Sequence, residues 1–348
     1  MLGQTLSHTY KRYRTLQTQT IKALPIVILM PHSACNCRCV MCDIWKGNHN
    51  LHQLTETDVR SILETLKKFE TRLVLMSGGE ALLNPLFFNF CEILRKENIK
   101  VNLLSTGITL KKNAAKIVDH VNEIIVSLDG DELTHNRIRN INDAFSKLRE
   151  GITEIKSINP DYRITGRSVI HQLNFMKWPA IIEAAKDLRL DQISFLPADV
   201  SSHAFNRDIL WDINRQHEIL PSFEQIAELK SVIEQFLKDY KKELQNGFIA
   251  ESPSKIWKIY EYYAACYGLN SFPVKRCNAP SVSTVIEADG TVRPCFFHQP
   301  FGNIRNLPLD KIVNSDAAVA FRKQLDIDAD ETFIRCVCHL NLSPRSVV

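Results

Sequence analysis

Short runs of Val, Ile and Leu alternate with longer amphipathic segments between about residues 25 and 200. The apolar runs show little alternation with polar residues, which is typical of parallel strands that are covered on both faces. The segments between them carry apolar residues at helical spacing. The pattern predicts six strands: Ile26–Met30, Leu73–Ser77, Val101–Ser105, Ile124–Leu128, Ser168–His171 and Gln192–Leu196.

Strands that alternate with helices predict βαβ units and an α/β fold built on a parallel sheet. Six such units in roughly 175 residues are fewer than the eight that a closed barrel needs in about 250 residues. We therefore expect an open, partial (β/α)6 barrel of the TIM type, or a doubly wound sheet.

The pattern changes after residue 197. Residues 198–220 look irregular, and two helices are predicted at Phe223–Leu244 and Pro253–Tyr267. A β-hairpin is predicted over residues 281–298, with its turn at Asp289-Gly290. The expected organisation is an N-terminal segment (1–23), a partial-barrel core (24–220), a helical connection (221–270) and a C-terminal domain made of the hairpin plus a helix (271–348).

Composition narrows the function classes. The 348 residues are 45% hydrophobic and carry a net charge of only +4, which does not favour nucleic acid or an anionic membrane as partner. The polar N-terminal 23 residues lack the apolar stretch of a signal peptide, so we expect a cytoplasmic protein. Thiols stay reduced there, and clustered cysteines among the ten are expected to be metal ligands rather than disulfides.

Four cysteines lie in the stretch "ACNCRCVMCDIW", directly after the first predicted strand. Cys35, Cys39 and Cys42 have the spacing C-x3-C-x2-C. Three thiolates can hold three irons of a [4Fe–4S] cube and leave the fourth iron open, as a catalytic metal centre requires. A zinc site that uses Cys39, Cys42 and two other ligands is the alternative.

Distinctive residues also follow the next three strands. They are "SGGEALLNP" (77–85), "STG" (105–107) and "VSLDGDELTHNRIRN" (126–140). The carboxyl ends of barrel strands usually form the active site. With the cysteine loop, these motifs in this order resemble the radical S-adenosylmethionine (SAM) superfamily, and the resemblance covers about residues 26–200.

The resemblance implies a [4Fe–4S] cluster bound by Cys35, Cys39 and Cys42, with SAM on its open iron. Cys37 is then an additional cysteine that binds no iron. The resemblance assigns seven residues to SAM: Met41 packs on the adenine, Gly78, Gly79 and Glu80 receive the amino group, Ser127 and Arg139 contact the carboxylate or ribose, and Leu196 offers main-chain contacts to adenine.

A second set of cysteines lies in the last third of the chain. Cys277 and Cys295 flank Gly290 in a C-x12-G-x4-C pattern, and Cys336 and Cys338 follow. This set resembles the C-terminal extensions called SPASM and twitch. Four cysteines correspond to the twitch version with one auxiliary [4Fe–4S] cluster, to which only one of Cys336 and Cys338 need bind. A zinc site on the same four cysteines is the alternative.

The resemblance also predicts the activity. It implies reductive cleavage of SAM to a 5′-deoxyadenosyl radical, which abstracts hydrogen from a substrate, with electrons from a flavodoxin-type or ferredoxin-type donor. No catalytic residue is assigned, and His171, Asn174 and His298 are expected to face the substrate.

Peptide-modifying relatives often carry an N-terminal recognition domain, and only 34 residues precede Cys35. We therefore expect a small molecule, such as a sugar or nucleoside, that undergoes oxidation, decarboxylation or epimerisation. A peptide modifier is the alternative enzyme, and an iron–sulfur electron carrier or scaffold is the alternative from another class.

Overall fold

The sheet of this chain is open and mostly parallel. The computed structural model describes residues 2–205, 207, 209–338, 340–346 and 348. Within them, nine strands form one sheet in the order β6-β5-β4-β3-β2-β1-β7-β8-β9. β1 to β7 run parallel, whereas β8 pairs antiparallel with both of its neighbours, β7 and β9. The strands are β1 (Ile26–Leu29), β2 (Leu73–Met76), β3 (Lys100–Ser105), β4 (Glu123–Ser127), β5 (Ile164–Ile170), β6 (Gln192–Pro197), β7 (Ser283–Ile286), β8 (Thr291–Arg293) and β9 (Gly302–Asn303).

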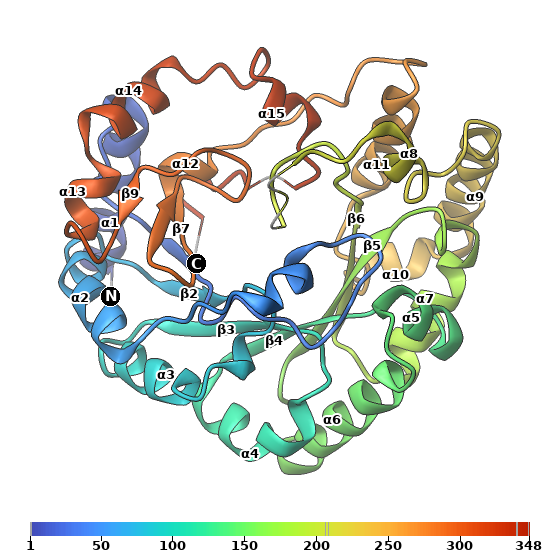
Figure 1. Ribbon diagram of the computed structural model, residues 1–348, viewed down its shortest axis with the longest axis horizontal. Helices are drawn as coiled ribbons and strands as arrows, with labels where there is room; N and C mark the ends of the chain where they lie inside the picture. The colour runs from blue at the N-terminus through green and yellow to red at the C-terminus, as the bar shows by residue number, and fades with distance from the viewer. Residues whose placement is uncertain (1, 206, 208, 339, 347) are drawn as a thin grey trace.

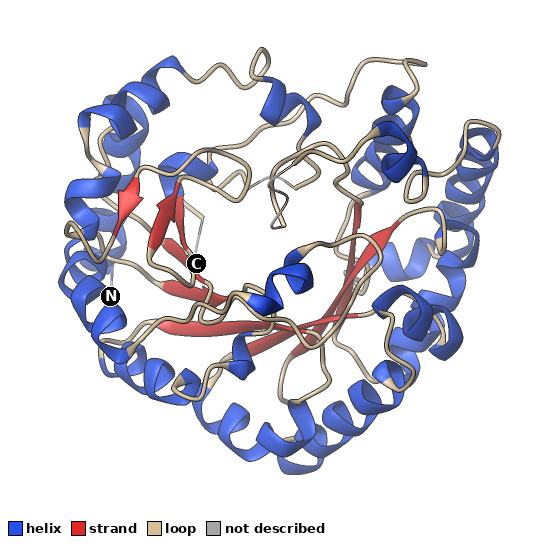
Figure 2. Ribbon diagram, in the orientation of Figure 1, coloured by secondary structure: helices blue, strands red, loops and turns tan. Residues whose placement is uncertain are grey.

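Helices cover the outer, convex face of this sheet, and loops fill its inner side (Figure 1, Figure 2). Every second side chain is buried along β1, β2, β3, β4 and β6, such as Val27 and Leu29 on β1. The predicted partial barrel is confirmed, because the six βα units leave the sheet open at β6. The helices of these units are α2 (Glu56–Lys68), α3 (Phe87–Lys96), α4 (Leu110–His120), α5 (Glu132–Arg139), α6 (Ala144–Ile158) and α7 (Trp178–Asp187).

The segment that follows β6 is helical in pieces. α8 (Ile213–His217), α9 (Gln225–Asp239), α10 (Lys241–Gln245) and α11 (Pro253–Cys266) succeed one another. The first predicted helix is thus interrupted at Tyr240, whose backbone leaves the helical conformation. Every helix in the part of the chain that the structure describes is too short or too polar to cross a bilayer.

The C-terminal extension continues the core sheet through β7, which pairs with β1. The predicted hairpin is confirmed: the Gly290 amide donates to the Glu287 carbonyl at 2.9 Å, and Gly290 has a φ of +89°, which favours glycine. Arg305 then binds both carboxylate oxygens of Asp58, at 3.0 Å each. The extension is therefore joined to the barrel. Its helices are α12 (Ala279–Val282), α13 (Leu309–Val313), α14 (Asp316–Gln324) and α15 (Glu331–Arg335).

The N-terminal segment forms a helix that the apolar pattern does not predict, α1 (Leu2–Thr18). The helix buries polar side chains, among them Arg12 and Thr15. The Arg12 guanidinium donates to the carbonyls of Ser343 and Ser346 near the end of the chain. Because this packed face is partly polar, hydrophobic periodicity gives little signal for it.

Candidate functional site

Residues after β1 and at the carboxyl ends of β2 to β6 line one cavity of about 230 Å³, which we call the barrel cavity. It lies where the active site of a parallel barrel is expected. Nine of the ten residues predicted for the cluster loop and for SAM line this cavity, and Glu80 is the exception. The nine are Cys35, Cys39, Met41, Cys42, Gly78, Gly79, Ser127, Arg139 and Leu196.

The cysteine loop is held by the end of α5. The amides of Arg38 and Val40 donate to the carbonyls of Arg139 and Ile138, both at 3.0 Å. These bonds satisfy carbonyls that a helix leaves free at its carboxyl end. Arg139 is the last residue of α5, a helix that hydrophobic periodicity does not reveal. The polar sequence of α5 hides its helical pattern.

The additional cysteine, Cys37, is buried and does not line the barrel cavity. A hydrogen bond from Cys37, assisted by the positive charge of Arg139, lowers the pKa of Cys39 to about 6, although burial opposes the shift. The same bond raises the pKa of Cys37. Since the thiolate is the form that binds metal, this arrangement suits Cys39 as a ligand and Cys37 as its donor.

Gly78 and Gly79 let the loop after β2 lie directly on the cysteine loop. Gly78 has a φ of +108°, in the region that favours glycine. A Cβ atom at Gly79 would lie 2.1 Å from the carbonyl oxygen of Ala34, the residue before Cys35. The next amide, that of Glu80, donates to the same carbonyl at 2.9 Å. The two loops are therefore in backbone contact, which a side chain at position 79 would prevent.

We expect Gly79→Ala to displace the cysteine loop, because the new methyl group overlaps backbone that cannot move aside cheaply. Such overpacking should lower the free energy of unfolding by roughly 1–3 kcal/mol. It should also reduce the iron retained after reconstitution, measured by colorimetric iron assay. Gly247→Ala is the control for iron content. Its φ of +79° disfavours alanine and should itself cost roughly 1–2 kcal/mol, but no atom lies within 4 Å of the new methyl group, so the iron content should stay parent-like. Parent-like iron content and stability in Gly79→Ala would contradict this role.

The Glu80 side chain lies behind residues that line the barrel cavity, because its partners Ser105 and Thr106 are in the lining and Glu80 is not. Its carboxylate is fully buried and accepts hydrogen bonds from the Thr106 amide (2.8 Å), the Thr106 hydroxyl (2.7 Å) and the Ser105 hydroxyl (3.0 Å). Burial raises the pKa of Glu80, and these donors oppose the shift. Glu80 thus joins the ends of β2 and β3, which gives the "STG" motif a structural role. The expected contact of Glu80 with the SAM amino group stays a prediction.

Arg139 belongs to a buried ion pair that the sequence does not predict. Its Nη2 lies 2.5 Å from Oδ2 of Asp129, and its Nη1 lies 3.5 Å from the Cys39 sulfur. Burial opposes the charge of Arg139, but Asp129 and Cys39 together raise its pKa. Asp129 also accepts the amide of Val169 at 3.1 Å. The pair therefore connects the cysteine loop, α5 and β5. Asp129 and Arg139 both lie within the "VSLDGDELTHNRIRN" motif, and this is the sequence feature that could have indicated the pair.

The four C-terminal cysteines line a second cavity of about 120 Å³, which we call the cysteine cavity. Cys277, Cys295, Cys336 and Cys338 are all brought together there, although 61 positions separate the first from the last. The Cys336 and Cys338 sulfurs lie 4.0 Å apart, and Cys336 donates to the Cys338 carbonyl at 2.6 Å. Its hydrogen bond with Cys338 raises the pKa of Cys336 and lowers that of Cys338, so Cys338 is the better thiolate of the two.

His298 also lines the cysteine cavity and not the barrel cavity. Its Nδ1 lies 3.1 Å from the Cys295 sulfur, and its Nε2 lies 3.3 Å from Oδ1 of Asp330. His298 is expected to face a substrate, and the structure places it beside Cys295, a candidate cluster ligand.

The other two predicted substrate-facing residues, His171 and Asn174, lie in the core. His171 and Asn174 are completely buried, and neither lines the barrel cavity or the cysteine cavity. The Asn174 amide donates to the carbonyls of Asp129 (3.1 Å) and Val169 (3.0 Å), and burial lowers the pKa of His171 to about 4. The chain turns at the end of β5, so these side chains brace the turn.

The donor sets suit iron–sulfur clusters. Each cavity has thiols along its wall, three in the barrel cavity and four in the cysteine cavity. In the described part of the chain, no three Cys, His, Asp or Glu side chains gather closely enough for one metal ion. A cube takes one thiolate on each of its irons and accepts ligands that are spread more widely.

Comparison with known families agrees with this geometry. The model of the radical SAM superfamily matches residues 29–185, which include the cysteine loop and the Gly78-Gly79 turn. The model of an iron–sulfur cluster-binding domain, SPASM, matches residues 277–338. This second match begins at Cys277 and ends at Cys338.

Individual relatives are more distant. An Fe-coproporphyrin III synthase from Methanosarcina barkeri is 22% identical over 83% of this chain and 73% of its own length. A SAM-dependent nucleotide dehydratase from a Fibrobacter species is 23% identical over 47% of this chain and 52% of its own length. A probable GTP 3′,8-cyclase from Methanocaldococcus jannaschii is 29% identical over 47% of this chain and 56% of its own length.

Two solved structures share the fold. SuiB of Streptococcus suis bound to SAM superposes with a TM-score of 0.65 and 12% identity, and the match covers 96% of this chain and 78% of SuiB. The structure of anSMEcpe with bound SAM and the Cp18Cys peptide gives a TM-score of 0.61 and 17% identity, over 90% and 88% of the two chains. At these identities the likeness concerns the fold alone.

Proposed function

Since this chain belongs to the radical SAM superfamily and carries a C-terminal iron–sulfur cluster-binding domain, we propose that it is an enzyme that abstracts hydrogen from a small organic molecule. The observation that supports the site is the barrel cavity, which Cys35, Cys39 and Cys42 line together with the Gly78-Gly79 turn. The family's [4Fe–4S] cluster with bound SAM supplies a 5′-deoxyadenosyl radical, and the auxiliary cluster provides a second redox centre.

The chain's own residues would position and shield this chemistry. Cys35, Cys39 and Cys42 would hold the cluster, and the ion pair of Arg139 with Asp129 would keep the cysteine loop on α5. Met41 and Leu196 offer apolar contact at the cavity wall, where adenine would pack. Ser127 presents a hydroxyl to the same cavity for the SAM carboxylate or ribose.

The sequence relatives favour a small molecule over a peptide. Their names refer to a coproporphyrin, a nucleotide and GTP. SuiB and anSMEcpe have been solved with bound peptides. They are only 12–17% identical to this chain, so their similarity concerns the fold and not the substrate. All ten cysteines are unpaired, which supports a reducing, cytoplasmic location.

Deuterium transfer tests this function. Extract from cells grown in D2O would be separated by dialysis into small-molecule and macromolecular fractions. Each fraction would be added to the reconstituted chain with unlabelled SAM and a low-potential reductant. We expect mass spectrometry to find deuterium in 5′-deoxyadenosine with the small-molecule fraction. Deuterium only with the macromolecular fraction would instead identify a peptide modifier, and no 5′-deoxyadenosine with either fraction would contradict a radical enzyme.

A further inference from the structure

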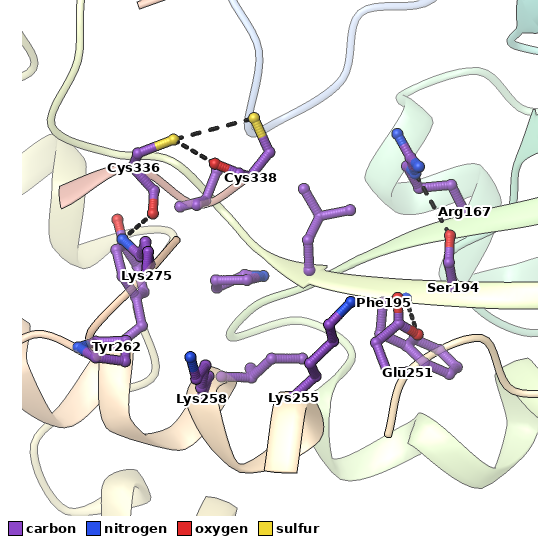
Figure 3. Close-up of a pocket in the computed structure, with 15 residues that line it drawn as sticks. Arg167, Ser194, Phe195, Glu251, Lys255, Lys258, Tyr262, Lys275, Cys336 and Cys338 are labelled. Carbon is purple, nitrogen blue, oxygen red and sulfur yellow. Dashed lines mark hydrogen bonds between the residues drawn. The ribbon is translucent and has the colours of Figure 1, made fainter. Parts of the chain in front are cut away.

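A third cavity, of about 300 Å³, opens beside the two cysteine sites (Figure 3). We call it the cation cavity, because four cationic side chains line it together with a single carboxylate, Glu251. The four are Arg167 from β5, Lys255 and Lys258 from α11, and Lys275 from the segment before Cys277. None of them stands out in the sequence.

The cation cavity lies between the other two. Arg167, Leu196, Pro197 and Val337 line both it and the barrel cavity. Cys336 and Cys338 line both it and the cysteine cavity. Figure 3 shows these two cysteines on the side opposite Lys255 and Lys258. A molecule in the cation cavity would therefore touch walls that belong to both candidate cluster sites.

The four cations outnumber the single carboxylate of this cavity, Glu251. Among the residues that the structure describes, none of the four cations forms an ion pair with a carboxylate. The Glu251 carboxylate instead accepts the amide of Phe195 at 3.0 Å. Three of the cations make neutral contacts: Arg167 Nε with Ser194 Oγ (3.4 Å), Lys258 Nζ with the Val274 carbonyl (2.6 Å) and Lys275 Nζ with the Ile334 carbonyl (3.0 Å).

The geometry leaves donors free for a ligand. An ammonium has three N–H groups and a guanidinium has five, so Arg167 and Lys258 each have donors beyond these contacts. The Lys255 ammonium makes no hydrogen bond to another described residue. Lys275 is different, because it also contacts the carbonyls of Phe333 and Cys336 and so holds the end of α15. Like charges gathered in a concave, partly desolvated site concentrate the field on an anion.

We propose that the cation cavity binds the anionic group, a carboxylate or a phosphate, of the substrate of this enzyme. Arg167, Lys255 and Lys258 bind the anion. The rest of the molecule extends past Leu196, Pro197 and Val337, which line both cavities, into the barrel cavity. This substrate class rests on the proposed function, because it assumes that hydrogen is abstracted in the barrel cavity. Anion binding itself does not depend on that assumption.

Isothermal titration calorimetry of the reconstituted full chain, with citrate and with pyrophosphate as probes at low salt, tests the proposal. We expect Lys255→Gln/Lys258→Gln to weaken binding of at least one probe by about tenfold or more, and added salt to weaken it in the parent. The matched control is Lys241→Gln/Lys242→Gln, an exposed pair on α10 with the same change of charge. The control should bind both probes as the parent does.

Equal affinity in the parent and in the Lys255/Lys258 variant would overturn the proposal. The same holds if this variant binds both probes normally but accepts electrons more slowly from an acidic donor protein, since the lysines would then serve donor docking. Anion binding that the double variant loses, in a chain that does not cleave SAM, would uphold the cavity and overturn only the proposed function.

The active small-molecule fraction distinguishes the two anions. We expect anion-exchange resin to retain the material that promotes deuterium transfer. Loss of its activity after phosphatase treatment would identify a phosphate ester, whereas survival would identify a carboxylate. Activity that passes through the resin would overturn the anionic substrate.

Discussion

Replacing Cys35, Cys39 and Cys42 together by Ala is expected to halve the iron of the reconstituted chain, from about eight to about four atoms. The three cysteines line the barrel cavity, whereas Cys277, Cys295, Cys336 and Cys338 line the cysteine cavity. The two sets are separate in space, so removal of one set should leave the other cluster in place. Iron, sulfide and zinc would be measured per chain after anaerobic reconstitution.

Cys37→Ala is the matched control within the same loop. Cys37 does not line the barrel cavity, so this variant should keep about eight irons. Because the variant removes the hydrogen-bond donor to Cys39, we expect the cluster to be bound more weakly but still to form. About four irons in the parent and none in the triple variant would contradict the auxiliary cluster. Zinc in place of iron in the parent would contradict both clusters.

The second large effect is expected from the ion pair of Arg139 with Asp129. Asp129 is completely buried and Arg139 nearly so, and Asp129→Asn would leave the guanidinium without its carboxylate partner in the protein interior. Breaking a buried pair in this way lowers the free energy of unfolding by roughly 3–5 kcal/mol. Urea denaturation of the chain without clusters measures this change directly.

Two further variants test whether the pairing itself matters. Asp129→Asn/Arg139→Gln removes both charges. Its loss of stability should be smaller than the sum of the losses in Asp129→Asn and in Arg139→Gln. Arg163→Gln breaks a pair with Glu123 in which Arg163 is 49% exposed, and its effect should stay under about 1 kcal/mol. Similar losses for Asp129→Asn and Arg163→Gln would show that the buried pair does not hold the cysteine loop on α5.

The sequence predicts the repeating part of the fold well. Short runs of Val, Ile and Leu form the parallel strands, as their composition predicts. Along β1, β2, β4 and β6 only every second side chain is buried, and those between them are half-buried, so the expected cover on both faces is incomplete. Helices with polar interfaces give a weaker signal. α1 buries Arg12 and Thr15, and α5 is held by Arg139, so hydrophobic periodicity does not reveal either helix.

The candidate site is predictable where chemistry fixes the spacing. Cysteines that share a cluster and glycines that permit backbone contact stand out from the sequence, and the structure gathers them around the cavities described above. Side-chain direction is less predictable. Glu80, His171 and Asn174 follow strand ends, but their side chains are buried and pair with nearby backbone groups or hydroxyls.

Residues that act together from distant parts of the chain leave no sequence signal of their own. Arg167 looks like part of a strand, and Lys255 and Lys258 look like an ordinary helix surface. Only the packing of α11 and the C-terminal extension against β5 and β6 brings them into one cavity.

Cleavage of SAM tests the central claim most directly. The parent chain would be reconstituted anaerobically and incubated with SAM and a low-potential reductant, and 5′-deoxyadenosine and methionine would be quantified by mass spectrometry. We predict both products in equal amounts, and neither above background in the Cys35/Cys39/Cys42→Ala variant. Intact SAM in a parent that holds its full iron would contradict the account and would leave an iron–sulfur electron carrier or scaffold in its place.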